Sequence, residues 1–162
     1  MEFLRVDTND NLSSVVKVLR EAHGTVAEEF QFTKENNPTN SAFIDERTLR
    51  AQLEKGIELY QLTDHEKSIG CIAIEKSAHE AGTFYIEKVS IIPEERHQGH
   101  GVRLMEFAAG LIRERGGQWI SIALIDANTR LKQWYIMQGF KETGTKDFPR
   151  LPFRVCFMRK EI

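Results

Sequence analysis

Residues 89–108 read VSIIPEERHQGHGVRLMEFA and combine three structural signals in one stretch. An apolar run ends at Pro93, a polar loop with Gly99 and Gly101 follows, and the chain then enters an amphipathic helical pattern. Glycines let a backbone approach a ligand closely, and a helix N-terminus offers unpaired N–H groups and a favourable dipole. The stretch therefore predicts a strand–loop–helix unit with an anion site, best suited to a pyrophosphate, where the helix begins.

Basic side chains surround the two glycines, namely Arg96, His97, His100 and Arg103. They can add donors or positive charge to an anion site, although a glycine-assisted helix start with solvated basic residues would have the same sequence. Two common phosphate-binding loops are excluded. The chain has no G-x-x-x-x-G-K-[ST] segment, and Leu104 stands where a dinucleotide-binding fingerprint needs its last glycine.

Outward from this stretch, hydrophobic periodicity predicts the element order βααβββαβαββ in a single domain over residues 1–162. The predicted helices are 11–21, 45–55, 99–115 and 128–137, and the predicted strands are 2–7, 58–63, 69–75, 83–92, 119–125, 140–145 and 153–159. Residues 83–125 are predicted to form a βαβ unit, in which the two strands are parallel and the crossover between them is right-handed. The predicted fold class is α/β: a mixed sheet with helices on both faces.

Composition excludes several classes of protein. The chain has 162 residues, of which 41% are hydrophobic and 28% charged, and its formal net charge is −2. This is too apolar for disorder, and no apolar run approaches the roughly 20 residues that span a bilayer. The acidic N-terminus lacks a signal-peptide core, and the near-neutral charge argues against nucleic acid and anionic lipid as partners. We expect a cytoplasmic domain with no nucleic-acid or membrane partner.

The cysteines and histidines do not form a recognisable metal motif. Cys71 and Cys156 each lie in a strand-like apolar run, which predicts two buried free thiols. Neither has a C-x-x-C partner, and only His97 and His100 are close together among the five histidines. We therefore expect no metal site.

Two spaced motifs resemble the Gcn5-related N-acetyltransferase (GNAT) superfamily. Arg96-x-x-Gly99-x-Gly101 matches the R/Q-x-x-G-x-G/A signature of that family. The family's second segment is matched by Asn128-x-x-Leu131-x-x-x-Tyr135-x-x-x-Gly139-Phe140. The element order is similar as well, so the resemblance covers essentially the whole chain. It implies a mostly antiparallel GNAT sheet with a central parallel pair, and acetyl-CoA as cosubstrate with its pyrophosphate on the glycine loop.

The resemblance also implies which residues contact acetyl-CoA. They are Val89, Ser90, Ile91, Arg96, His97, Gln98, Gly99, His100, Gly101, Val102, Asn128 and Tyr135. The chain departs from the family pattern at His97, where glycine is common, at His100, where an aliphatic residue is usual, and at Leu131, where a small residue is more frequent.

Strand 83–92 is expected to carry part of the reaction. Regular alternation would place Tyr85, Glu87, Val89 and Ile91 on one face, and Ile86, Lys88 and Ser90 on the other. In the family this strand diverges from the next one, and the pantetheine of acetyl-CoA pairs with its free backbone groups. A backbone N–H within 89–91 would then stabilise the oxyanion formed when an amine attacks the thioester.

Tyr135 and Glu87 are the candidate catalytic residues. Asn128, Leu131 and Tyr135 share one helix face, and the resemblance makes Tyr135 the general acid that protonates the departing thiolate. The segment Tyr85-Ile86-Glu87 resembles a Y-x-E segment of family members that acetylate polyamines, which makes Glu87 the candidate base. An ion-paired Glu87 and a core Tyr135 are the structural alternatives.

The sequence does not identify the acceptor amine. In the family, the acceptor pocket is built from the loops that correspond here to 24–43 and 146–152. Carboxylates and aromatic rings occur in both loops and would suit a cationic amine. A polyamine, an amino sugar, an amino acid and a protein N-terminus all remain open, as does a homodimer.

The leading hypothesis is an acetyl-CoA-dependent N-acetyltransferase that acts on a primary amine of a small molecule or peptide. A non-catalytic acyl-CoA-binding or sensing module on the same scaffold is the first alternative, and an unrelated nucleotide-binding protein is the second.

Overall fold

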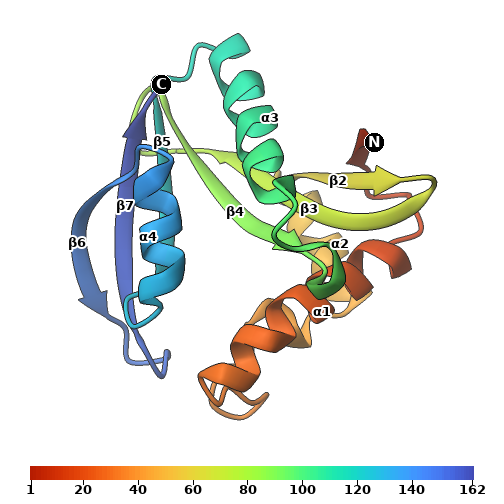
Figure 1. The fold of residues 1–162 in the computed structure, drawn as a ribbon, viewed down its shortest axis with the longest axis horizontal. Coiled ribbons are helices and arrows are strands. Elements are labelled where there is room, and N and C mark those ends of the chain that lie inside the picture. The colour runs from red at the N-terminus through yellow and green to blue at the C-terminus, as the bar shows by residue number, and fades with distance from the viewer.

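The predicted order of helices and strands is confirmed in the computed structural model, which describes residues 1–162 (Figure 1). The helices are α1 (Ser13–Glu29), α2 (Glu46–Glu54), α3 (His100–Glu114) and α4 (Thr129–Met137), with short 3₁₀ turns η1 (Ser41–Phe43) and η2 (Pro93–Glu95). The strands are β1 (Glu2–Val6), β2 (Glu58–Asp64), β3 (Lys67–Lys76), β4 (Thr83–Ile91), β5 (Trp119–Ile125), β6 (Lys141–Asp147) and β7 (Arg154–Glu161).

Helix α1 is longer than the predicted 11–21. It continues through Gly24 to Glu29 because Val26 and Ala27 extend its apolar face, and Ala27 is buried against the core. The helix ends just before Gln31, whose φ of 57° is left-handed and cannot continue a right-handed helix.

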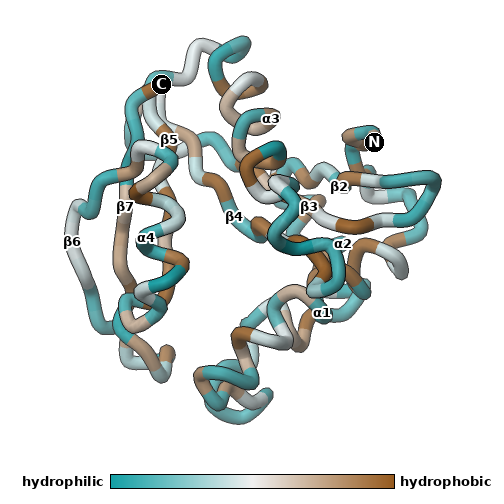
Figure 2. Tube along the Cα trace, in the orientation of Figure 1, coloured by the Kyte–Doolittle hydropathy of each residue, from teal (hydrophilic) through white to brown (hydrophobic).

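The seven strands form one sheet in the order β1-β2-β3-β4-β5-β7-β6. Every neighbouring pair is antiparallel except β4 and β5, which are parallel, so the predicted mixed sheet with one central parallel pair is confirmed. One continuous cluster of buried apolar residues extends from β1 to β7. Figure 2 places hydrophilic residues on the connections, including the β4–α3 loop and the chain between α1 and α2.

Helices cover both faces of the sheet, as expected. Helix α1 contacts β3 and β4 from one side, where His23 reaches Ser90. Helix α3 covers the other side, where its Phe107 packs edge-on against Tyr60 of β2 at 5.1 Å. Helix α4 lies on the α3 side, where its Trp134 is next to Gly101 of α3. We therefore refer below to an α1 side and an α3 side of the sheet.

The two parallel strands separate soon after they meet. Only Thr83, Phe84 and Tyr85 of β4 pair with β5, and from Ile86 onward β4 has no partner in β5. The divergence is plain in Figure 1, where β4 runs toward α1 while β5 stays with β7. Six residues of β4 thus leave a strand edge unpaired in the middle of the sheet.

The predicted alternation along β4 is wrong beyond Glu87. Ser90 lies opposite Cys71 and Glu87 lies opposite Ala73, so the two residues of β4 between these pairs lie opposite a single residue of β3. The extra residue is a β-bulge at Lys88, whose φ is 54°. Glu87 and Ser90 therefore share the α1 side of the sheet, although regular alternation would separate them.

Both cysteines are buried free thiols, as predicted. None of the helices combines the length and the apolar character that crossing a membrane requires.

Candidate active site

The bulge of β4 is fixed by side chains from two neighbouring elements. The Ser90 hydroxyl donates to the carbonyl oxygen of Lys88 at 2.9 Å, and the Cys71 thiol reaches the same oxygen at 3.6 Å. His23 Nε2 lies 2.9 Å from Ser90 Oγ. Burial, helped by the charges of Lys88 and Arg96, lowers the pKa of His23 to about 4, so its ring is neutral at pH 7. The unpaired edge of β4 is therefore held in a defined shape from the α1 side.

The glycine loop presents unpaired backbone amides at the start of α3. Gly99 takes a φ of 84°, a conformation that favours glycine, and no side chain caps the helix. The amides of His100, Gly101 and Val102 donate to no group of the chain. The geometry expected of an anion site is therefore present at this helix N-terminus.

Gly101 lies directly beneath the indole of Trp134 from α4. A Cβ atom at Gly101 would lie 3.0 Å from Trp134 Cζ2, closer than ordinary van der Waals contact. The glycine thus permits α3 and α4 to approach each other beside the unpaired amides. Trp134 is half-buried and packs edge-on against Tyr135, with ring centroids 4.9 Å apart.

Arg96 is engaged by the protein itself. Its guanidinium donates to the carbonyl oxygens of Ile91 at 3.2 Å and Ala22 at 2.8 Å, and to Thr25 Oγ1 at 3.0 Å. Partial burial lowers the pKa of Arg96. In this arrangement the side chain fastens the loop to α1, and an anion at the loop would meet backbone amides rather than this guanidinium.

The other loop residues divide by exposure. His97, Gln98 and Val102 are exposed and can meet a ligand from solvent. His100 is buried, its Nε2 has no hydrogen-bond partner, and the nearest carboxylate oxygen, of Glu95, is 3.9 Å away. His100 therefore packs into the core at the aliphatic position that it replaces.

Helix α4 places the second motif. Asn128 is the N-cap, and its buried side chain accepts a hydrogen bond from the amide of Leu131 at 3.2 Å. Tyr135 is buried, packs edge-on against Phe140 at 5.4 Å, and its hydroxyl has no hydrogen-bond partner in the chain. Burial raises the pKa of Tyr135, so the phenol stays protonated at neutral pH.

Glu87 has a carboxylate neighbour and no basic partner. On β3, Glu75 lies opposite Tyr85, and Ala73 lies opposite Glu87, so Glu75 and Glu87 are diagonal neighbours on the same face of the sheet. Burial first, and then Glu75, raise the pKa of Glu87. No Lys, Arg or His nitrogen lies within 4.0 Å of either carboxylate, so the ion-paired alternative for Glu87 is not what the structure contains.

The two loops expected to form the acceptor pocket contact each other. Phe32, after α1, packs against Phe153, just beyond the predicted 146–152, with ring centroids 5.3 Å apart. Arg130 at the start of α4 pairs with Glu29 at 3.2 Å. The α1–α2 connection and the β6–β7 connection thus contact each other through Phe32 and Phe153. Figure 1 shows both connections at the end of the molecule where β4 and β5 have diverged.

Comparison with known proteins identifies the family. Residues 28–162 match the model of the family described as "Acetyltransferase (GNAT) domain". The chain belongs to the GNAT acetyltransferase family.

Solved structures share this GNAT fold over nearly the whole chain. The ribosomal-protein-S18-alanine N-acetyltransferase from Escherichia coli superimposes with a TM-score of 0.75 at 17% identity, covering 99% of this chain and 93% of that one. The PaiA N-acetyltransferase from Thermoplasma acidophilum, in complex with coenzyme A, gives 0.70 at 18% identity, with full coverage of both chains. A GNAT acetyltransferase from Elizabethkingia anophelis with acetyl-CoA bound gives 0.70 at 15% identity, covering 99% of this chain and 97% of that one. No curated protein matched by sequence. At these identities the neighbours establish the fold.

Four residues of the candidate site were not predicted from the sequence: His23, Glu75, Lys88 and Trp134. His23 and Glu75 come from elements that only the sheet topology brings beside β4. Lys88 was predicted to lie on the face opposite Glu87, because the bulge contains no glycine that would indicate it in the sequence. Trp134 could have been suspected, since it precedes Tyr135 in the second motif.

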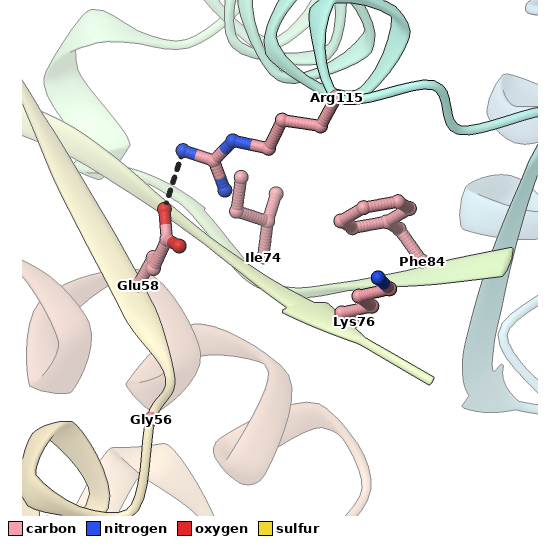
Figure 3. Close-up of a pocket in the computed structure, with 6 residues that line it drawn as sticks. All are labelled: Gly56, Glu58, Ile74, Lys76, Phe84 and Arg115. Atoms are coloured by element: carbon pink, nitrogen blue, oxygen red, sulfur yellow. Dashed lines mark ion pairs between the residues drawn. The ribbon is translucent and has the colours of Figure 1, made fainter. Parts of the chain in front are cut away.

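A hollow of about 280 Å³ lies elsewhere in the molecule (Figure 3). It is bordered by Phe84, Lys76 and an ion pair between Arg115 and Glu58 at 2.7 Å. Arg115 is the C-cap of α3, and the glycine loop precedes the first turn of the same helix. The hollow and the glycine loop therefore lie at opposite ends of α3. No predicted site residue lines this hollow.

One group of metal-binding side-chain types is present in Asp126, Glu142 and Cys156. The ammonium of Lys132 already neutralises it, at 2.7 Å from Asp126 and 3.3 Å from Glu142. Burial, and then Glu142, raise the pKa of Cys156 to about 11, which disfavours the thiolate that a metal needs. We assign no metal to this group.

Proposed function

We propose that the chain is an acetyl-CoA-dependent N-acetyltransferase that transfers an acetyl group to a primary amine. The observation that carries this proposal is the juxtaposition of uncapped amides at the start of α3 with the unpaired edge of β4. The first feature fits a pyrophosphate, and the second fits an extended chain with amide groups. Acetyl-CoA has both in series.

The residues present fit this cosubstrate. Gly99 and Gly101 leave the backbone of the loop open, and a side chain at Gly101 would press against Trp134. Most residues of the predicted set would contact acetyl-CoA directly, at its pantetheine or at its pyrophosphate. Val89, Ser90 and Ile91 would offer backbone groups to the pantetheine, and the backbone of residues 97–102 would surround the pyrophosphate, with the side chain of His100 in the core. Arg96 and Asn128 would act indirectly, by fixing the loop and the start of α4.

The chemistry is assigned to Glu87 and Tyr135. An amine is an ammonium at neutral pH, and Glu87 would accept its proton, directly or through a water. The nitrogen then forms a bond to the thioester carbon while a backbone N–H of β4 stabilises the oxyanion, and the C–S bond breaks. Tyr135 would return a proton to the leaving sulfur. Its raised pKa keeps that proton available but makes the transfer depend on the negative charge that develops on the sulfur.

A thiol-release assay with acetyl-CoA and a panel of amines tests the proposal, together with calorimetry of acetyl-CoA binding. We expect saturable binding and amine-dependent thiol release. Binding without release for any amine would favour the acyl-CoA-sensing alternative. Tight binding of ATP or NAD without competition from CoA would favour an unrelated nucleotide-binding protein.

A further inference from the structure

Lys88 is a basic side chain that the proposed chemistry does not use. The bulge directs it to the α1 side of the sheet, where its Nζ donates to the hydroxyl of Ser41 in η1 at 3.3 Å. Ser41 belongs to the connection between α1 and α2, one of the two loops expected to border the acceptor. Lys88 is therefore the residue of β4 that faces the acceptor loop.

The charge of Lys88 has no counter-ion in the protein. No carboxylate oxygen lies within 4.0 Å of its Nζ, and its only hydrogen bond is to a neutral hydroxyl. Burial lowers the pKa of Lys88, and Glu87 offsets this only in part. Lys88 is half-buried, and a lysine that loses part of its hydration usually gains a partner, because withdrawing an unpaired charge from water is costly. An uncompensated ammonium at this position favours the binding of an anion.

The other groups that face Lys88 do not provide negative charge. The thiol of Cys71 is neutral, since burial raises its pKa to about 12, and His23 is a neutral ring. Arg96, on the same side, adds a second positive charge that is bonded only to uncharged oxygens. Glu87 is the one carboxylate with a charge interaction at Lys88, and its oxygens lie more than 4.0 Å from Lys88 Nζ.

Charges of opposite sign therefore lie next to each other on the α1 side. Glu87 and Lys88 are consecutive residues that a regular strand would direct to opposite faces, and the bulge brings both to one face. A diamine would satisfy Glu87 but would add a third positive charge beside Lys88 and Arg96. A molecule with an ammonium and an anion a few bonds apart would compensate both residues.

We propose that the acceptor is a small zwitterionic amine, with Lys88 binding its anionic group, a carboxylate or a phosphate, while Glu87 receives the proton of its ammonium. This inference rests on the proposed acetyltransferase function and specifies its substrate class. Lys88 is then a specificity-determining residue.

The test compares acceptors that differ only in the anionic group. Glycine, β-alanine and γ-aminobutyrate are each assayed by thiol release against their amides, against aminoalkyl phosphates of the same length and against α,ω-diamines. We expect at least one acid or phosphate to exceed its amide in kcat/KM by roughly 10-fold or more, as expected for a charge-assisted hydrogen bond. The acid and phosphate series distinguish the two anionic groups.

Substitutions at Lys88 assign the preference to this side chain. Lys88→Met should abolish the difference between acid and amide while leaving the affinity for acetyl-CoA unchanged, and Lys88→Arg should retain part of it. Lys76→Met is the matched control, because Lys76 is an exposed lysine at the end of β3 and should leave the preference unchanged. Circular dichroism and thermal unfolding verify that each variant folds.

Equal rates for acids and amides, a preference for diamines, or the same loss on all acceptors in Lys88→Met would overturn the inference while leaving the acetyltransferase proposal intact. If no acceptor is turned over, calorimetry of the same acids and phosphates with the acetyl-CoA-saturated protein tests whether the anion site exists. Binding that Lys88→Met removes would support the anion site, and no binding would reject it. Failure to bind acetyl-CoA at all would instead reject the proposed function.

Discussion

The imidazole of His23 on α1 and the hydroxyl of Ser90 on β4 form a 2.9 Å hydrogen bond on the α1 side of the sheet. Because the Ser90 hydroxyl donates to the carbonyl of Lys88, the imidazole must be the donor, with its proton on Nε2. This chain of hydrogen bonds links α1 to the bulge of β4. The helix that borders the acceptor loop therefore also sets the shape of the strand edge assigned to acetyl-CoA.

His23 should make the protein sensitive to acid. Its pKa in the folded state, about 4, lies below the ordinary value of 6.5, so the unfolded chain binds the proton more tightly. The stabilising contribution is complete above pH 6.5 and is lost as the pH falls toward 4, by up to about 3 kcal/mol of unfolding free energy. Urea unfolding at several pH values measures it. His23→Gln keeps a donor for Ser90 but does not titrate, so its stability should fall less steeply. Parallel pH dependences for the two proteins would show that His23 is not responsible.

Gly101→Val should weaken acetyl-CoA binding by roughly 10-fold or more, since a close contact of this kind costs at least about 1 kcal/mol to relieve. The Cβ of the added side chain would lie 3.0 Å from Trp134 Cζ2. Either α3 or α4 must therefore shift, next to the unpaired amides. Calorimetry with acetyl-CoA measures the effect. Gly110→Ala is the matched control, because it lies on the same helix with no atom within 4 Å of an added Cβ. Unchanged affinity in Gly101→Val would reject the pyrophosphate site at this loop.

Trp134 should report cosubstrate binding by fluorescence. The chain has two tryptophans, and Trp119 is covered on one face by Arg159, whose guanidinium lies 4.1 Å from the ring centroid. In Trp119→Phe, where Trp134 is the only indole, acetyl-CoA should change the emission intensity or wavelength. In Trp134→Phe, where Trp119 alone emits, the titration should be flat. A response from Trp119 alone would place the ligand away from the α3–α4 contact.

The position of the glycine loop at a helix start, and of Tyr135 on the helix that Asn128 caps, was predictable from the sequence because such spacing is local: a few residues define a helix start or one helix face. The orientation of Ser90 relative to Glu87 was not predictable, because the bulge at Lys88 inserts one residue into the alternation and contains neither glycine nor proline. Arg96 was expected to face the anion, but its acceptors include Ala22, 74 positions earlier in the chain. Contacts of that range depend on how α1 packs on the sheet, which periodicity does not specify.

Tyr135→Phe should lower kcat by roughly 100-fold or more with little change in acetyl-CoA affinity, because it removes a proton donor without changing the packing. Steady-state thiol release and calorimetry separate the two effects. Tyr60→Phe serves as control, since Tyr60 is likewise buried but its hydroxyl bonds to Glu58 on the α3 side. If kcat is unchanged in Tyr135→Phe, the phenol is part of the core and another group or water protonates the sulfur.

Glu87 should set the acidic limb of the pH–rate profile. A base acts only when deprotonated, and burial together with the Glu75 carboxyl raises the pKa of Glu87 above its ordinary value of 4.5. The kcat/KM should therefore rise with pH through a midpoint higher than that of an ordinary glutamate. Glu75→Gln removes the neighbouring negative charge but leaves the burial, so the midpoint should move to lower pH while the rate at its plateau is largely kept. Glu87→Gln should lose most of the rate along with this limb.

A third substitution separates this effect from a loss of stability. Glu58→Gln alters another half-buried strand glutamate, one that is paired with Arg115 on the α3 side, and should destabilise the protein without moving the midpoint. If Glu75→Gln leaves the midpoint where it is in the native protein, the two carboxyls do not titrate as neighbours. If Glu87→Gln retains the native profile, the ammonium loses its proton to another group. Only a shift in Glu75→Gln combined with loss of the limb in Glu87→Gln assigns the base to Glu87 and its tuning to Glu75.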